Sequence, residues 1–285
     1  MIKYVDEHYP NQKLAGKLSK IWGVKNFHFA QMDFNEQYTL FSMLSARKNI
    51  DQALTISNDS LIKFNQKIAN GYKAGLGMSY LSTYLGEKKQ HVTASDFRKT
   101  IEKYAHKEVD WFFNTYVATD KKIDFKIKKV EKTEDSITFV LKNKRGTNVP
   151  ISVFGLENDS VVSHYWFSDI DSTKSITIPR KSEDRLVLNY DQKIPEFNQR
   201  DNWKTLNGFF SSNKKLKFQF FKDTEDPYYN QVFYVPIANF NLYDGITPGL
   251  RLYNKTFLER PFQYDISPTY SFLEHTMVGK ASFRY

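Results

Sequence analysis

The spacing of the apolar residues changes near residue 121, and this change limits what the chain can fold into. Before it, apolar side chains recur three and four residues apart, which is typical of a helix with one buried face. After it, they alternate with polar ones, which is typical of strands. The helical spacing is seen in Leu76, Tyr80, Leu81, Tyr84 and Leu85. The alternation is seen in Ile123, Phe125 and Ile127. The sequence therefore predicts an α+β protein with several domains, in which an all-α part comes first.

The expected helical lobe covers residues 1–120. Helical spacing occurs at 13–22, 35–47 and 72–85, and again after a capping-box-like Thr93-Ala-Ser-Asp96. A last stretch, 108–117, is apolar nearly all round, and we expect it to be buried in the core.

The strand-like part divides into three segments. Residues 121–192 hold short alternating runs at steps of 10 to 13 residues, which predicts an immunoglobulin-like antiparallel β-sandwich. Residues 193–214 are expected to be a connector made of turns. Residues 215–285 alternate again, with Tyr and Phe against Lys, Arg, Asp and Gln. That last pattern fits the start of an outer-membrane β-barrel cut off by the C-terminus, and it fits equally a soluble antiparallel sheet with one wet face.

Composition excludes several classes of function. The chain of 285 residues has no cysteine, so disulfides, cysteine-ligated zinc and a cysteine nucleophile are excluded. The net charge is +9, but the lysines are spread through the chain and no nucleic-acid-binding motif accompanies them. We therefore expect no nucleic-acid partner. Residues 1–15 do not resemble a signal peptide, and no run reaches the roughly 20 apolar residues of a membrane helix.

One helical stretch holds the candidate functional residue, Tyr72. Asn70 and Gly71 are expected to be loop residues that place Tyr72 in the first turn, and Gly86 is expected to end the helix as a C-cap. A side chain in a first turn can point out of the helix end into a cleft. Spacing alone favours an ordinary core aromatic at Tyr72.

The stretch Tyr72-Lys-Ala-Gly75, followed by Leu-x-x-Leu and then Tyr84-Leu-Gly86, resembles the helix of aminopeptidase-N-like zinc metallopeptidases, which are gluzincins. Asp96-Phe-Arg-Lys-Thr-Ile-Glu102 and Val109-Asp-Trp-Phe-Phe113 resemble two further helices of that family. The pattern is most similar to long members from Bacteroidetes, and it covers roughly residues 1–120. The resemblance implies peptide-bond hydrolysis of peptide or protein substrates, with the Tyr72 hydroxyl donating to the oxyanion of the tetrahedral intermediate.

The zinc motif of that family, His-Glu-x-x-His, is missing. None of the six histidines lies four residues from another: His8, His28, His91, His106, His164 and His275. In the family this motif precedes the tyrosine helix. We therefore expect the chain to be the C-terminal part of a longer peptidase that holds zinc upstream, and to bind no zinc itself. Glu7 and His8 are expected to lie at a solvated helix end.

Two further expectations follow from the resemblance. It favours a periplasmic or outer-membrane location, with association through the C-terminal strands. It also implies a complete helix between Gly86 and the next helix, where this chain has only residues 87–94. The alternative function is a non-enzymatic binding or anchoring module of a surface or outer-membrane protein.

Overall fold

The computed structural model describes residues 8–86, 97–206, 214–258 and 260–285. They form two compact units. The first unit consists of the described residues within Met1–Pro10 and Asn35–Asn213, and the second of those within Asn11–Phe34 and Lys214–Tyr285. Residues 11–34 thus group with the C-terminal strands, so the expected lobe of residues 1–120 does not coincide with one unit.

The helices of the first unit follow the helical spacing of the sequence. The expected helix 35–47 is confirmed as α3. The other segments are the 3₁₀ turn η2 (Asn58–Ser60), the π-helical turn η3 (Asn65–Ala69), α4 (Asn70–Leu85), α5 (Phe97–Tyr104) and the π-helical turn η5 (Phe112–Val117), after α3 (Glu36–Arg47). The predicted capping residues 93–96 and the shortened stretch 87–94 lie outside the described residues.

Two glycines explain the form of α4. Gly86 takes the left-handed conformation, with φ 69° and ψ 44°, and ends the helix as expected. Gly77 lies on the buried side, where a Cβ atom would overlap the ring of Tyr116 in η5. Only glycine allows these two segments to approach so closely.

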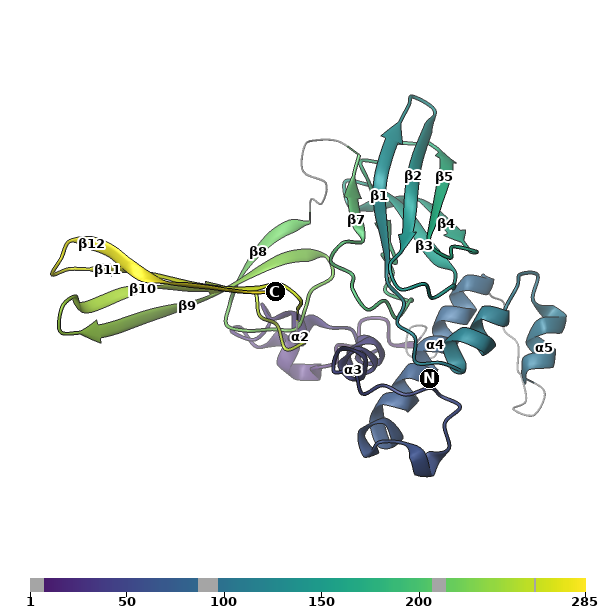
Figure 1. Ribbon diagram of the computed structural model, residues 1–285, viewed down its shortest axis with the longest axis horizontal. Coiled ribbons are helices and arrows are strands. Elements are labelled where there is room, and N and C mark those ends of the chain that lie inside the picture. The colour runs from purple at the N-terminus through teal and green to yellow at the C-terminus, as the bar shows by residue number, and fades with distance from the viewer. Residues whose placement is uncertain (1–7, 87–96, 207–213, 259) are drawn as a thin grey trace. The chain divides into compact units, whose positions relative to one another are not determined.

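The strands of the first unit form two antiparallel sheets (Figure 1). One has the order β1-β2-β5 and the other β4-β3-β6-β7. Their bounds are β1 Phe125–Lys132, β2 Ser136–Asn143, β3 Ile151–Glu157, β4 Ser160–Phe167, β5 Thr173–Pro179, β6 Arg185–Leu188 and β7 Trp203–Thr205. Residues of both sheets meet in one hydrophobic core, among them Phe139 of β2 and Val153 of β3, which fits the expected sandwich.

The same core continues into the helical part, because Tyr80, Leu81 and Trp111 belong to it. The expected connector, 193–214, is also part of this fold. Its strand β7 pairs with β6, and its Ile194 side chain is fully buried. The Asn, Asp and Pro residues of this stretch predicted turns only, so the prediction missed both the strand β7 and the buried Ile194.

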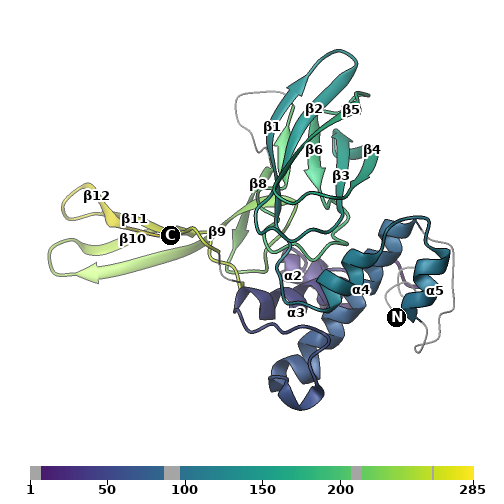
Figure 2. The same ribbon diagram turned by 45° about the vertical axis from the view of Figure 1, so that its right-hand side comes forward.

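The second unit contains a five-stranded sheet of order β12-β11-β10-β9-β8. Figures 1 and 2 show β9–β10 and β11–β12 as two long hairpins side by side. The bounds are β8 Lys215–Phe220, β9 Tyr229–Asn241, β10 Gly245–Tyr253, β11 Gln263–Ser271 and β12 Thr276–Arg284.

Two expectations for the second unit are wrong. Strands β8 and β9 run parallel, because the connection 221–228 returns along the sheet before β9 begins. The expected helix 13–22 is only the 3₁₀ segment η1 (Gly16–Lys20), followed later by the short α2 (His28–Gln31). Its apolar residues Leu18, Ile21 and Trp22 are exposed, so no buried face stabilises a longer helix.

Across the described ranges, no helix combines the length and the apolar character needed to cross a membrane.

Candidate functional site

Tyr72 lies inside a continuous helical segment, not in a first turn. Helical backbone begins at Lys63, passes through the π turn η3 and runs on into α4. The expectation that Asn70 and Gly71 are loop residues is therefore wrong. In the π turn, the buried Asn65 side chain donates to Ile50 O, at 2.6 Å, and to Gln52 Oε1, at 2.9 Å, which ties the turn to the segment before it.

The Tyr72 side chain is half-buried against α3. Its ring centroid lies 5.1 Å from that of Tyr38 and 4.9 Å from that of Phe41. Its hydroxyl donates to Gln37 Oε1 at 3.1 Å. The two rings fix the direction of the hydroxyl, and the acceptor is a neutral amide. A negatively charged oxygen accepts a hydrogen bond more strongly than this amide, so it could replace Gln37 Oε1 as the acceptor of the Tyr72 hydroxyl.

A small pocket lies next to this region, within the first unit. Its volume is about 30 Å³, which suits a single water molecule. Lys73 and Lys122 line it, but Lys73 Nζ donates to Gln52 O and Thr119 O, and Lys122 pairs with Asp51. Burial lowers the pKa of Lys73. The pocket is too small for a substrate, and we assign it no role.

Among the described residues, no group of three or more His, Cys, Asp and Glu side chains could hold a metal ion. His8 is exposed, and Glu7 lies outside the described residues. His164 stacks on Phe154, with ring centroids 4.0 Å apart, and burial lowers its pKa. The described residues therefore do not fit the zinc that the resemblance implies.

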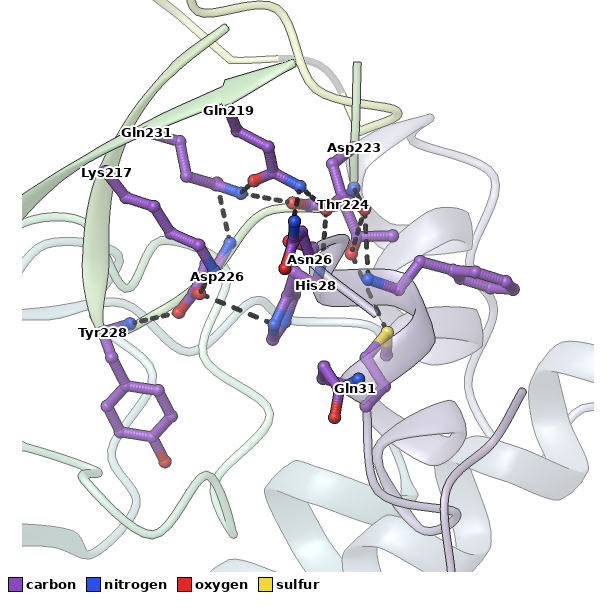
Figure 3. A network of polar contacts seen from close by, with 12 residues as sticks. Asn26, His28, Gln31, Lys217, Gln219, Asp223, Thr224, Asp226, Tyr228 and Gln231 are labelled. Carbon is purple, nitrogen blue, oxygen red and sulfur yellow. Dashed lines mark hydrogen bonds and ion pairs between the residues drawn. The ribbon is translucent and has the colours of Figure 1, made fainter. Parts of the chain in front are cut away.

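A second polar centre lies in the second unit, at the buried carboxylate of Asp223 (Figure 3). This carboxylate accepts from the backbone N–H groups of His28 and Phe29 at the start of α2, from Thr224 N and from Gln219 Nε2. Every one of these partners is a donor, and the helix N-terminus also favours a negative charge. Asp223 therefore attaches residues 11–34 to the sheet.

Asp226 extends this network (Figure 3). Lys217 Nζ lies 3.2 Å from Asp226 Oδ2, and His28 Nδ1 lies 3.6 Å from the same oxygen. Gln231 accepts from Asp226 N at 2.9 Å and donates to Thr224 O at 3.0 Å. The network joins β8, β9 and their connection to α2. The sequence gives no sign of it, because Asp223 and Asp226 look like ordinary turn residues.

Glu196 is another buried carboxyl, and it lies in the stretch 193–214 that was expected to be a connector made of turns. It is 1% exposed and accepts from Phe125 N at 3.0 Å and Asn202 Nδ2 at 2.6 Å. Burial raises its pKa to about 8, against these two hydrogen bonds. Both oxygens face donors of the fold, so its role is to hold the former connector against β1.

Comparison with protein-family models, with curated proteins and with solved structures found no match for this chain.

Proposed function

We propose that this chain is part of a zinc peptidase of the aminopeptidase-N type, and that Tyr72 supplies a hydrogen bond to the oxyanion formed during peptide hydrolysis. The observation that supports this most is the hydroxyl of Tyr72, held in one direction by two aromatic rings and bonded to a replaceable amide. The π-helical turn just upstream is a second support, because such turns are rare and often occur near functional sites.

The proposed role of Tyr72 is a single hydrogen bond, donated to the oxyanion. When a nucleophile attacks a peptide carbonyl, negative charge develops on its oxygen, and an oriented donor stabilises that charge without further reorganisation. The phenol hydroxyl leaves Gln37 Oε1 and donates to the oxyanion instead. Its ring stays in place, because the contacts with Tyr38 and Phe41 do not involve the hydroxyl.

The described residues do not fit a zinc site. This chain contributes the donor, and the α3–α4 packing contributes the scaffold that orients it. Peptide or protein substrates, and a periplasmic or outer-membrane location, belong to the same proposal.

The proposal is tested in the gene product that carries this sequence, with an assay of peptide hydrolysis. Tyr72→Phe removes the donor and keeps the ring, so kcat should fall by about 100- to 1000-fold while KM and melting temperature change little. Tyr84→Phe is the matched control on the same helix. Its ring packs against Trp111 and Trp166, in the core, and we expect kcat to stay within about twofold.

Tyr80→Phe is a poor control, because the buried Tyr80 hydroxyl donates to Pro150 O and its loss should destabilise the first unit. If Tyr72→Phe keeps the parental kcat, or loses activity only in step with melting temperature, Tyr72 is a structural aromatic. That outcome would favour the non-enzymatic alternative.

A further inference from the structure

The five-stranded sheet of the second unit has one apolar face and one polar face. Side chains alternate between faces along a strand, and the register shows which residues share a face. Cross-strand pairs on one face are Phe240 with Ile246, Pro236 with Leu250, Tyr234 with Leu252, Ile266 with Ala281, and Tyr264 with Phe283. Pairs on the other face include Asn239 with Thr247, Ser267 with Lys280 and Asp265 with Ser282.

In part of this sheet, the exposure of the two faces is the reverse of that in an ordinary soluble sheet. On the polar face, Gln219, Thr247 and Thr269 are 5%, 2% and 3% exposed. On the apolar face, Phe218, Phe240 and Met277 are 63%, 71% and 65% exposed. Residues 11–34 cover part of the polar face, and the polar network around Asp223 holds them there (Figure 3). Part of the polar face is therefore buried within the second unit, whereas Lys280, Ser282 and Arg284 on the same face of β12 are exposed.

Charge follows the same division. Within the five described strands, the apolar face carries no Lys, Arg, Asp or Glu, whereas the polar face carries Lys217, Arg251, Asp265 and Lys280. Arg251 and Asp265 form a salt bridge there. A face without charge across five strands complements an uncharged apolar medium, because each charge placed there would have to be desolvated.

The dimensions of the face fit the hydrocarbon layer of a bilayer. Strands β10, β11 and β12 have nine residues each and β9 has 13, whereas a strand needs about 9–11 residues to cross. Aromatic side chains occur toward both ends of the hairpins, as in Phe240 and Tyr234 of β9. The six residue steps between these two span about 20 Å. The pairs between them, Leu250 with Pro236 and Pro268 with Gly279, contain no aromatic ring.

We propose that the apolar face of this sheet contacts the acyl chains of a lipid bilayer. Aromatic bands at both boundaries and alternation between a lipid-facing and a polar side are features of membrane strands. The inference does not depend on a catalytic role for Tyr72. Backbone groups in hydrocarbon need partners, so the edge strands β8 and β12 pair with the same edges of further copies of this chain when it is reconstituted alone.

The experiment uses the absence of cysteine from the chain. Ala281 and Ser282 are adjacent, exposed residues of β12 that face opposite sides of the sheet. Each is replaced by a single cysteine, Ala281→Cys or Ser282→Cys, and labelled with an environment-sensitive fluorophore. The full chain is then reconstituted into phosphatidylcholine vesicles, with and without lipids that carry a nitroxide quencher on the acyl chain.

The label at position 281 should shift its emission to shorter wavelength and be quenched at least about threefold more than the label at 282. Ala281→Arg should weaken vesicle association by at least about 30-fold, whereas Ser282→Arg should leave it within about threefold. Equal quenching of the two labels would overturn the proposal. So would a shift at position 281 that appears without vesicles and disappears on dilution, which would show that a second copy covers the face.

Discussion

At the scale of single residues, Glu196 couples the stability of the first unit to pH. Its carboxyl is fully buried, and its pKa is raised from 4.5 to about 8, mainly by burial. Between these values the folded state holds a proton that the unfolded state has released. The favourable contribution is therefore complete below about pH 4.5 and is lost as pH rises through 8.

We expect the free energy of unfolding to decrease between pH 5 and pH 8, by up to about 1.4 kcal/mol per pH unit from this group. Glu196→Gln cannot ionise and should remove that slope, although its amide meets the donors of Phe125 and Asn202 and should lower stability below about pH 5, where the parent carboxyl is protonated. Urea unfolding at several pH values measures the slope. Glu131→Gln, at an exposed position of β1, is the control, and a slope unchanged by Glu196→Gln would show that Glu196 is ionised throughout.

The resemblance alone selects Tyr72 as the candidate residue, and it does not show the surroundings of that side chain. The ring contacts with Tyr38 and Phe41 depend on how α3 packs on α4. Glu196 and Asp223 could not be identified at all, since each became buried through partners far along the chain. A carboxylate in a polar stretch carries no local sign of such burial.

At the scale of elements, two glycines of one helix should respond in opposite ways to the same substitution. Gly77→Ala places a Cβ atom in the ring of Tyr116, and such overpacking typically costs about 1–3 kcal/mol. Gly71→Ala meets nothing within 4 Å, and alanine favours helix over glycine by about 1 kcal/mol. Chemical denaturation should show a lower free energy of unfolding for Gly77→Ala and a higher one for Gly71→Ala. A stable Gly77→Ala protein would mean that η5 can move away from α4.

Periodicity predicted the elements best where one face is buried. α3, the Gly86 cap and the strands of the sandwich follow from spacing and turn residues alone. It failed at residues 13–22, where helical spacing occurs but Leu18, Ile21 and Trp22 remain exposed. It also could not give the parallel pairing of β8 with β9. Direction there depends on the path of residues 221–228, which is fixed by the Asp223 network.

At the scale of the whole molecule, alternation alone could not decide which face of the C-terminal sheet is buried. A soluble sheet and a membrane sheet have the same sequence period, and they differ in which side packs against the rest of the protein. Residues 11–34 join this unit from the other end of the chain. Sequence order does not show that they cover the polar side.

The net charge of +9 is a second possible cause of membrane association, besides the apolar face. The dependence of association on salt concentration distinguishes the two causes. Binding through basic charge requires anionic lipids and weakens as ions screen it, since the Debye length falls from about 10 Å at 0.1 M salt to about 3 Å at 1 M. Contact through an uncharged apolar face does not depend on either. We therefore expect association with neutral phosphatidylcholine vesicles to change by less than about twofold between 0.1 M and 1 M salt, measured by flotation. Association only with anionic vesicles, lost at high salt, would assign the binding to the lysines and leave the apolar face to another partner.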